Sequence, residues 1–204
     1  MYNEIITMLE LQQEMNAKVH PQWREQGFQW HRAIWVECAE LLEHYGWKWW
    51  KKQNADRNQV NLELVDIWHF GISELLQSSN SHEAICELIQ KGFEDTVPQA
   101  DFREAVEQFV ADTLNRKTFY VASFASVMAA ADLSFDELYR QYLGKNVLNL
   151  FRQNHGYKDG SYQKIWQGKE DNEHLVEAVE QLGLNAPDAR NMLYRELQRR
   201  YPGN

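Results

Sequence analysis

Residues 35–42 read WVECAELL and residues 62–68 read LELVDIW, and these two stretches decide the fold. In each stretch two acidic residues lie three positions apart, and the four are Glu37, Glu40, Glu63 and Asp66. A spacing of three places two side chains on the same face of an α-helix. The residues around both acidic pairs are apolar, which is unusual for a solvated surface. The pattern predicts two packed helices that present four carboxylates to one site.

Helical patterns continue through the rest of the chain. The predicted helices cover residues 4–19, 30–45, 58–77, 81–91, 101–115, 119–131, 134–154, 172–182 and 187–200. There is no alternating pattern long enough to form a sheet, and residues 154–168, which contain three glycines, are predicted to be a loop. The expected fold class is therefore all-α, a helical bundle built around the two carboxylate-bearing helices.

The composition narrows the class of protein. The 204 residues are 44% apolar, with only 10 glycines and 4 prolines, which argues for a folded chain with a sizeable core. The formal charge is -9, from 21 basic and 30 acidic residues. Because proteins hold phosphate backbones mainly through Lys and Arg, we expect no nucleic-acid polymer as a partner.

The chain also lacks sequence signals for membranes and secretion. No stretch reaches the roughly 20 apolar residues that a membrane span needs. Residues 1–14 carry acids and no basic segment, unlike a signal peptide. Cys38 and Cys86 lie within apolar helical patterns and are predicted to be buried free thiols. We therefore expect a cytoplasmic protein with no membrane contact.

Four carboxylates on two packed helices repel one another unless they are protonated or bind cations. Mg²⁺ prefers carboxylate and water oxygens and is often shared with substrate phosphates. One alternative is a pair of ordinary acidic faces that form surface salt bridges. A second alternative is a di-iron bundle, but that site needs two Glu-x-x-His pairs and only Asp66 with His69 approaches one.

Positive charge is concentrated in two segments. Residues 47–52 read WKWWKK, which is also typical of a basic surface turn. Farther along, Lys145, Asn149 and Arg152 form one stripe of a predicted helix. Tyr157 and Lys158 follow a turn at Gly156, and this combination of groups suits a polyphosphate. The alternative for the stripe is a solvated basic face. No Walker A sequence is present, so phosphate binding would depend on side chains and Mg²⁺.

These motifs, in this order, resemble those of the dimeric dUTPases, which belong to the all-α nucleoside triphosphate pyrophosphatases. The similar segments are residues 35–41, 47–51, 63–70, 145–158 and 166–172. The resemblance extends over about residues 8–172. Residues 77–115 and 173–204 carry no assignable motif, and we expect them to be an inserted helical lobe and a C-terminal helical cap of a single domain, residues 1–204.

The resemblance implies a role for each matching residue. The Mg²⁺ ligands would be Glu37, Glu40, Glu63 and Asp66, with Glu37 and Glu40 as catalytic residues and Glu37 as the group that orients or deprotonates water. The phosphate-binding residues would be Lys48, Lys145, Asn149, Arg152, Tyr157 and Lys158. The base and sugar would be bound by Gln12, Asn16, Trp50, His69 and Phe70. Because residues 12 and 13 are both glutamine, either of them could read the base.

The implied reaction is Mg²⁺-dependent hydrolysis of dUTP, and also of dUDP, to dUMP by attack of water on a phosphoryl group. A homodimer is implied as well, with the partner subunit contributing to the base pocket. Two alternatives stay open: the same chemistry on another nucleotide such as dCTP, and a binding protein that retains the fold.

Tryptophan is concentrated in the first third of the chain, where seven of the eight lie. We expect Trp35 and Trp68, which flank the acidic pairs, to be packing residues. The tryptophans of residues 47–50 lie on a basic connection, where a base and sugar need walls. Trp23 and Trp30 have no predicted role.

Overall fold

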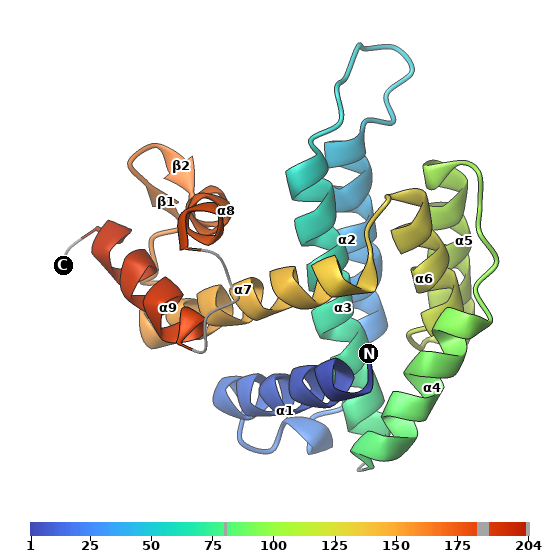
Figure 1. The fold of residues 1–204 in the computed structure, drawn as a ribbon, viewed down its shortest axis with the longest axis horizontal. Helices are drawn as coiled ribbons and strands as arrows, with labels where there is room; N and C mark the ends of the chain where they lie inside the picture. The colour runs from blue at the N-terminus through green and yellow to red at the C-terminus, as the bar shows by residue number, and fades with distance from the viewer. Residues whose placement is uncertain (80, 183–187, 203–204) are drawn as a thin grey trace.

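The computed structural model describes residues 1–79, 81–182 and 188–202. In these residues the predicted all-α class is confirmed (Figure 1). The elements are α1 (Tyr2–Val19), the 3₁₀ helix η1 (Trp23–Glu25), α2 (Trp30–Tyr45), α3 (Arg57–Ser78), α4 (His82–Glu94), α5 (Phe102–Arg116), α6 (Val121–Ala130), α7 (Phe135–Asn154), β1 (Ile165–Trp166), β2 (Lys169–Glu170), α8 (Asp171–Leu182) and α9 (Ala189–Arg200). The predicted helix start at residue 187 lies outside the described residues, and α9 begins two positions later.

Helices α2 and α3 form the central pair, joined by a loop that projects beyond the other helices (Figure 1). Gly46 ends α2, as its sequence predicts, with a φ of 92° and an N–H that donates to the Leu42 carbonyl. Asp56 caps α3 by accepting a hydrogen bond from the Gln59 N–H. These two ends fix where each acidic pair lies along the helix pair.

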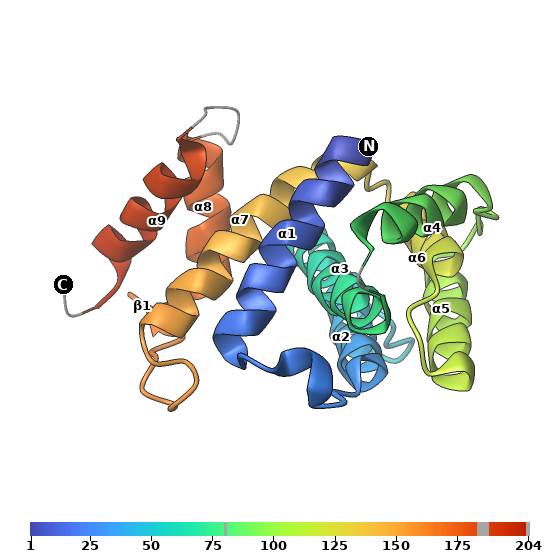
Figure 2. The same ribbon diagram turned by 90° about the horizontal axis from the view of Figure 1, so that it is seen from below.

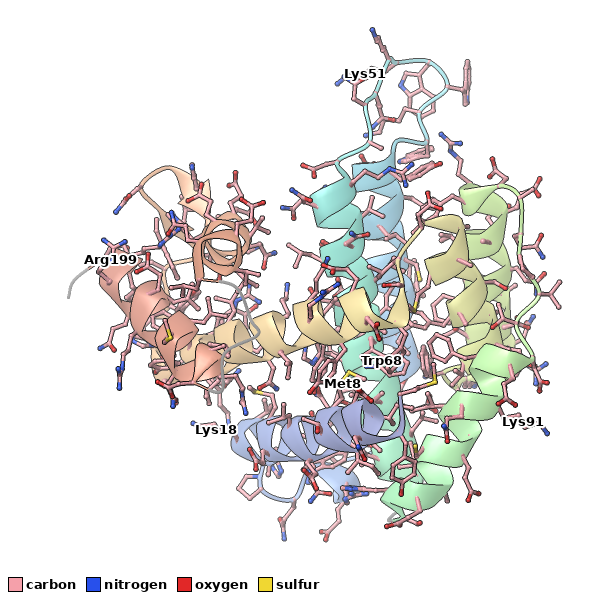
Figure 3. All side chains as sticks on the ribbon, viewed as in Figure 1. Met8, Lys18, Lys51, Trp68, Lys91 and Arg199 are labelled. Carbon is pink, nitrogen blue, oxygen red and sulfur yellow. The ribbon has the colours of Figure 1, made fainter. Side chains whose placement is uncertain are left out.

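The main hydrophobic core joins α1 to α6 and the first half of α7. Trp68 is fully buried at its centre, where it stacks on Phe124 and donates its indole N–H to Met8 Sδ (Figure 3). The prediction that Trp68 packs in the core is confirmed. The same prediction for Trp35 is wrong within the subunit, because its side chain lies on the outer face of α2 and is 42% exposed.

Helix α7 runs from the main core to a second cluster formed with α8 and α9 (Figure 2). Phe151 of α7 lies in this cluster beside Trp166 of β1. Strands β1 and β2 pair as an antiparallel hairpin, so the predicted loop is wrong for residues 165–166. Gln167 and Gly168 both have positive φ, which is the geometry of a two-residue hairpin turn. Strands of two residues are too short to show an alternating pattern.

No helix within the described residues combines the length and the apolar character that a membrane crossing requires.

Candidate active site

Three of the four predicted metal ligands meet between α2 and α3. Carboxylate oxygens of Glu37, Glu63 and Asp66 lie within 4.8 Å of one another. Glu63 is buried, and Glu37 and Asp66 are half-buried. Glu40 comes one turn after Glu37 on α2, is exposed, and lies at the edge of this carboxylate cluster. The spacing of three therefore places both acids of a pair on the same side of their helix, but one acid of each pair is more buried than the other.

The carboxylate cluster is electrostatically strained without a cation. Burial, and then the charge of Asp66, raise the pKa of Glu37 to about 7 and that of Glu63 to about 9. One ammonium group offsets part of this charge, since Lys145 Nζ lies 2.7 Å from Asp66 Oδ2. A compact set of carboxylate oxygens with unbalanced negative charge fits a hard divalent cation such as Mg²⁺.

The raised pKa values predict how stability depends on pH when metal is absent. Glu37 and Glu63 bind protons more tightly in the folded chain, so their stabilising contribution is complete at low pH and is lost as pH rises through about 7 and about 9. In EDTA we expect the melting temperature to fall between about pH 5 and about pH 9. Calorimetry on the wild type and on Glu63→Gln tests this, because the variant should show a shallower fall; equal slopes would contradict the assignment.

The carboxylates separate two hollows in the surface. The first, of about 310 Å³, includes Glu37 and Asp66 in its wall. The second, of about 370 Å³, includes Glu40 and Glu63. The other residues of the first hollow are Gln12, Met15, Asn16, Val19, Trp23, Phe28, Trp30, His69, Phe70, Asn149, Arg152, Gln153 and Tyr157. The second hollow also contains His44, Asp56, Gln59, Lys164, Glu170, Asn172 and Glu173.

The predicted base-binding residues of α1 and α3 meet in the first hollow. Gln12 and Asn16 of α1 and His69 of α3 are all buried there. His69 Nδ1 lies 2.6 Å from Gln12 Oε1, and burial lowers the pKa of His69 to about 3. Gln13, by contrast, is exposed and accepts a hydrogen bond from Arg24. The structure thus places Gln12, and not Gln13, in the pocket.

Aromatic rings form the apolar wall of the first hollow. Trp30 lies 6.2 Å from Phe70 and 5.5 Å from Phe28, measured between ring centroids. Trp23 of η1 is buried beside Trp30. Of these rings, the sequence predicted only Phe70 as a wall residue. The concentration of tryptophan in the first third of the chain was the available signal, but the segment between α1 and α2 has no periodicity that would show which rings face inward.

The predicted phosphate-binding residues of α7 lie close to the carboxylates. Arg152 donates to both oxygens of Asp171, at 2.8 and 2.9 Å, and Asp171 is fully buried. Although burial opposes its charge, these hydrogen bonds raise the pKa of Arg152 above its usual range. Asn149 accepts from Arg152 at 3.3 Å, and Tyr157 lies under its guanidinium. Asp171, which comes from the start of α8, was not predicted as a site residue.

Two further predicted cations differ in their location. Lys145 is buried and donates to Asn172 Oδ1 as well as contacting Asp66. Lys158 donates to the carbonyl of Val19, a residue of the first hollow's wall. Lys164, in the wall of the second hollow, is a cation that the sequence analysis missed. It lies in the glycine-containing segment that was read only as a loop.

Lys48 and Trp50 do not join this site within the subunit. Both lie on the projecting loop between α2 and α3, whose Lys51 points away from the helices (Figure 3). Lys48 forms an ion pair with Glu43, and Trp50 is 56% exposed beside Trp47.

Comparison with known proteins gives one finding at the level of the family. A search of curated proteins found no match. The family model described as dUTPase matches residues 4–157, which is most of the chain and includes α1, α2, α3 and α7. The matched region contains the carboxylate cluster and every residue that lines the first hollow. The chain therefore belongs to the dimeric, all-α dUTPase family and is a dUTP diphosphatase.

Proposed function

We propose that this enzyme hydrolyses dUTP and dUDP to dUMP and requires Mg²⁺, which Glu37, Glu63 and Asp66 bind together with Glu40. The observation that carries this proposal is the position of the carboxylates between the two hollows. The first hollow combines aromatic walls with buried amides, as a base and sugar require. The second leaves space for the outer phosphates beside Lys164 and Asn172.

In this proposal the residues of α7 bind and orient the phosphate chain. Arg152 and Tyr157 face the first hollow, where the phosphate nearest the sugar would lie. Lys145 is buried against Asp66 and Asn172, and so places a fixed positive charge between the two hollows. A cation that is already held by hydrogen bonds loses little conformational entropy when a phosphate binds.

Glu37 is the proposed general base. Its carboxylate belongs to the cluster and faces the first hollow, and burial raises its pKa to about 7. A carboxylate with a pKa near the working pH can accept a proton from the attacking water and release it later. Bound Mg²⁺ would polarise the phosphoryl oxygens, lower the pKa of a water molecule and offset the charge of the leaving group.

A substrate panel tests the proposed function. Purified protein is incubated with Mg²⁺ and dUTP, dUDP, dCTP, dTTP or UTP, and the nucleotide products are separated by chromatography. We expect dUMP from dUTP and dUDP, much slower turnover of dCTP and UTP, and no turnover in EDTA. Comparable turnover of dCTP would support a broader pyrophosphatase, and no turnover of any nucleotide would support a binding protein that retains the fold.

We also propose that the enzyme is a homodimer in which Trp50 and Lys48 serve the partner's site. Both residues lie on the projecting loop (Figure 1), and neither lines the first hollow of its own subunit. Trp49 is 90% exposed on the same loop. Trp35 and Val36 add an exposed apolar face on α2. Apolar surface of this kind is typical of a protein interface.

A mixing experiment distinguishes a shared site from a site within one subunit. We expect Trp50→Ala and Glu37→Gln each to have low activity, since the first lacks a wall of the base pocket and the second lacks the base. If Trp50 serves the partner, a mixed dimer contains one intact site, and mixing the two variants after reversible dissociation restores activity. If Trp50 serves its own subunit, no site is intact and mixing restores nothing. Steady-state turnover of dUTP is the measurement.

The remaining proposals concern domain organisation and location. We propose one domain, in which residues 77–115 form a lobe and residues 173–204 a cap. Helices α4 and α5 share the main core, and α8 and α9 pack on α7, which supports this division. We propose a cytoplasmic location because Cys38 and Cys86 are both buried and free, as expected in a reducing compartment.

A further inference from the structure

Ser73 of α3 is a fully buried polar residue next to the base-binding amides. It is one turn beyond His69 on the same helix, and its hydroxyl donates to the His69 carbonyl at 2.7 Å. Asn16 Oδ1 also lies 3.3 Å from Ser73 Oγ, but the His69 carbonyl is the nearer acceptor and can only accept, so the single hydroxyl proton of Ser73 is directed to that carbonyl. The Ser73 oxygen is left to act as an acceptor.

This acceptor sets the orientation of both amides in the pocket. Asn16 Nδ2 lies 3.1 Å from Ser73 Oγ and donates to it, which leaves Asn16 Oδ1, 3.3 Å from the same oxygen, to accept from Gln12. Gln12 Nε2 donates to that oxygen at 3.0 Å. Gln12 Oε1 then accepts from His69 Nδ1 at 2.6 Å. The chain of hydrogen bonds therefore starts at the carbonyl of His69 and ends at the ring of the same residue.

The protonation of the His69 ring fixes the last donor and acceptor of this chain of hydrogen bonds. Burial lowers the pKa of His69 to about 3, so the ring is neutral and carries one proton. Because Nδ1 donates to Gln12, Nε2 is an acceptor, and in the described structure this buried atom has no hydrogen-bond partner. Tyr142 stacks on the ring at 4.3 Å, and its hydroxyl donates to the Met8 carbonyl at 2.9 Å and lies 3.1 Å from Gln12 Oε1. The tautomer of His69 and the orientation of Gln12 support each other.

The hydrogen-bonding groups that are still free in the pocket determine which base fits it. Each amide has one N–H left to donate, and His69 Nε2 is left to accept. The pairing edge of uracil offers two carbonyl acceptors with an N–H donor between them. Cytosine has an amino donor in place of one carbonyl and an acceptor in place of the N–H. An amide that could rotate would bind either base, whereas an amide of fixed orientation rejects the base that presents a donor where uracil has a carbonyl.

We propose that Ser73 is a specificity-determining positioning residue, which acts through Asn16 and Gln12 to select uracil over cytosine. The proposal rests on the proposed function of the first hollow as the base pocket. Ser73 is fully buried and does not belong to the described wall of that hollow, whereas Asn16, Gln12 and His69 do. It therefore acts without touching the base, by committing its one proton to the backbone.

The test is the selectivity of Ser73→Ala. Without the hydroxyl, Asn16 can rotate and present its oxygen to the base. We expect the ratio of kcat/KM for dUTP to that for dCTP to fall about tenfold or more, chiefly through a higher KM for dUTP and a lower KM for dCTP. Ser123→Ala is the matched control, since Ser123 is a buried serine of α6 whose hydroxyl donates to the carbonyl of Tyr120, the residue before that helix. It should keep the wild-type ratio.

The possible outcomes separate this inference from the proposed function. If the wild type prefers dUTP and folded Ser73→Ala keeps the same ratio, the role of Ser73 is refuted and the proposed function stands. If the wild type shows no preference for dUTP, the base pocket itself is assigned wrongly and both proposals fail. If Ser73→Ala does not fold, Ser73→Cys fills the same space with a weak donor and should show the same loss of selectivity, and an unchanged ratio there overturns the inference.

Discussion

Replacement of Glu37 by Gln is expected to lower kcat for dUTP by about 10²–10⁴-fold, the contribution of a positioned general base. The same change should raise the melting temperature of the metal-free protein at pH 8, because it removes a charge from the carboxylate cluster that burial and Asp66 disfavour. Added Mg²⁺ should stabilise the wild type more than the variant, because binding to the folded state alone raises stability. Stopped-time assays and calorimetry with and without Mg²⁺ measure the three effects.

For Glu37→Gln the expected changes in kcat and in melting temperature have opposite signs, and this makes the result decisive. A general loss of structure would lower activity and melting temperature together. Glu10→Gln is the control, since Glu10 is an exposed acid of α1 outside both hollows. We expect it to leave kcat and the response to Mg²⁺ unchanged. A Glu37→Gln enzyme that turned over dUTP at the wild-type rate would remove Glu37 from the mechanism.

The second large effect is expected at the buried pair of Arg152 and Asp171. Arg152→Met leaves the fully buried Asp171 without its cation, and breaking a buried pair in this way costs about 3–5 kcal/mol. For a chain of this size we expect a fall in melting temperature of roughly 10 °C. Activity should fall as well, because Arg152 faces the first hollow. Thermal unfolding and the KM for dUTP are the measurements.

A double variant separates the structural role of this pair from its role in binding. Asp171→Asn removes the buried charge and still accepts the hydrogen bond of Tyr162. Combined with Arg152→Met, it should recover most of the lost stability, because no unpaired charge stays buried. Activity should not recover, because the guanidinium is still missing. Recovery of both would mean that Arg152 acts only through the fold.

The structure also explains why α8 and α9 matter to a site that lies mostly in earlier residues. Asp171 and Asn172 at the start of α8 hold two cations of α7, the half-buried Arg152 and the buried Lys145. The hairpin β1–β2 comes directly before them, and its tight turn fixes where α8 begins. The C-terminal segment thus positions charges that α7 alone would leave free to rotate.

The sequence by itself determined where the helices lie and which kinds of functional group the site contains. Helix periodicity and end signals act over three to four residues, so Gly46 and Ser134 mark helix ends without tertiary information. The spacing within each acidic pair likewise follows from the helical turn alone. These features are local, and local patterns can be recognised in a single sequence.

Only the tertiary structure decided which of these residues meet. It buried Gln12 and left Gln13 outside, and it placed Glu63 deep in the carboxylate cluster while Glu40 stayed at the edge. The hydrogen bond from Tyr142 to the Met8 carbonyl joins residues 134 positions apart, and the bond from Asn16 to Ser73 joins residues 57 apart. The depth of a side chain and the orientation of an amide depend on partners brought together by the packing of α1, α3 and α7, and no local pattern encodes that packing.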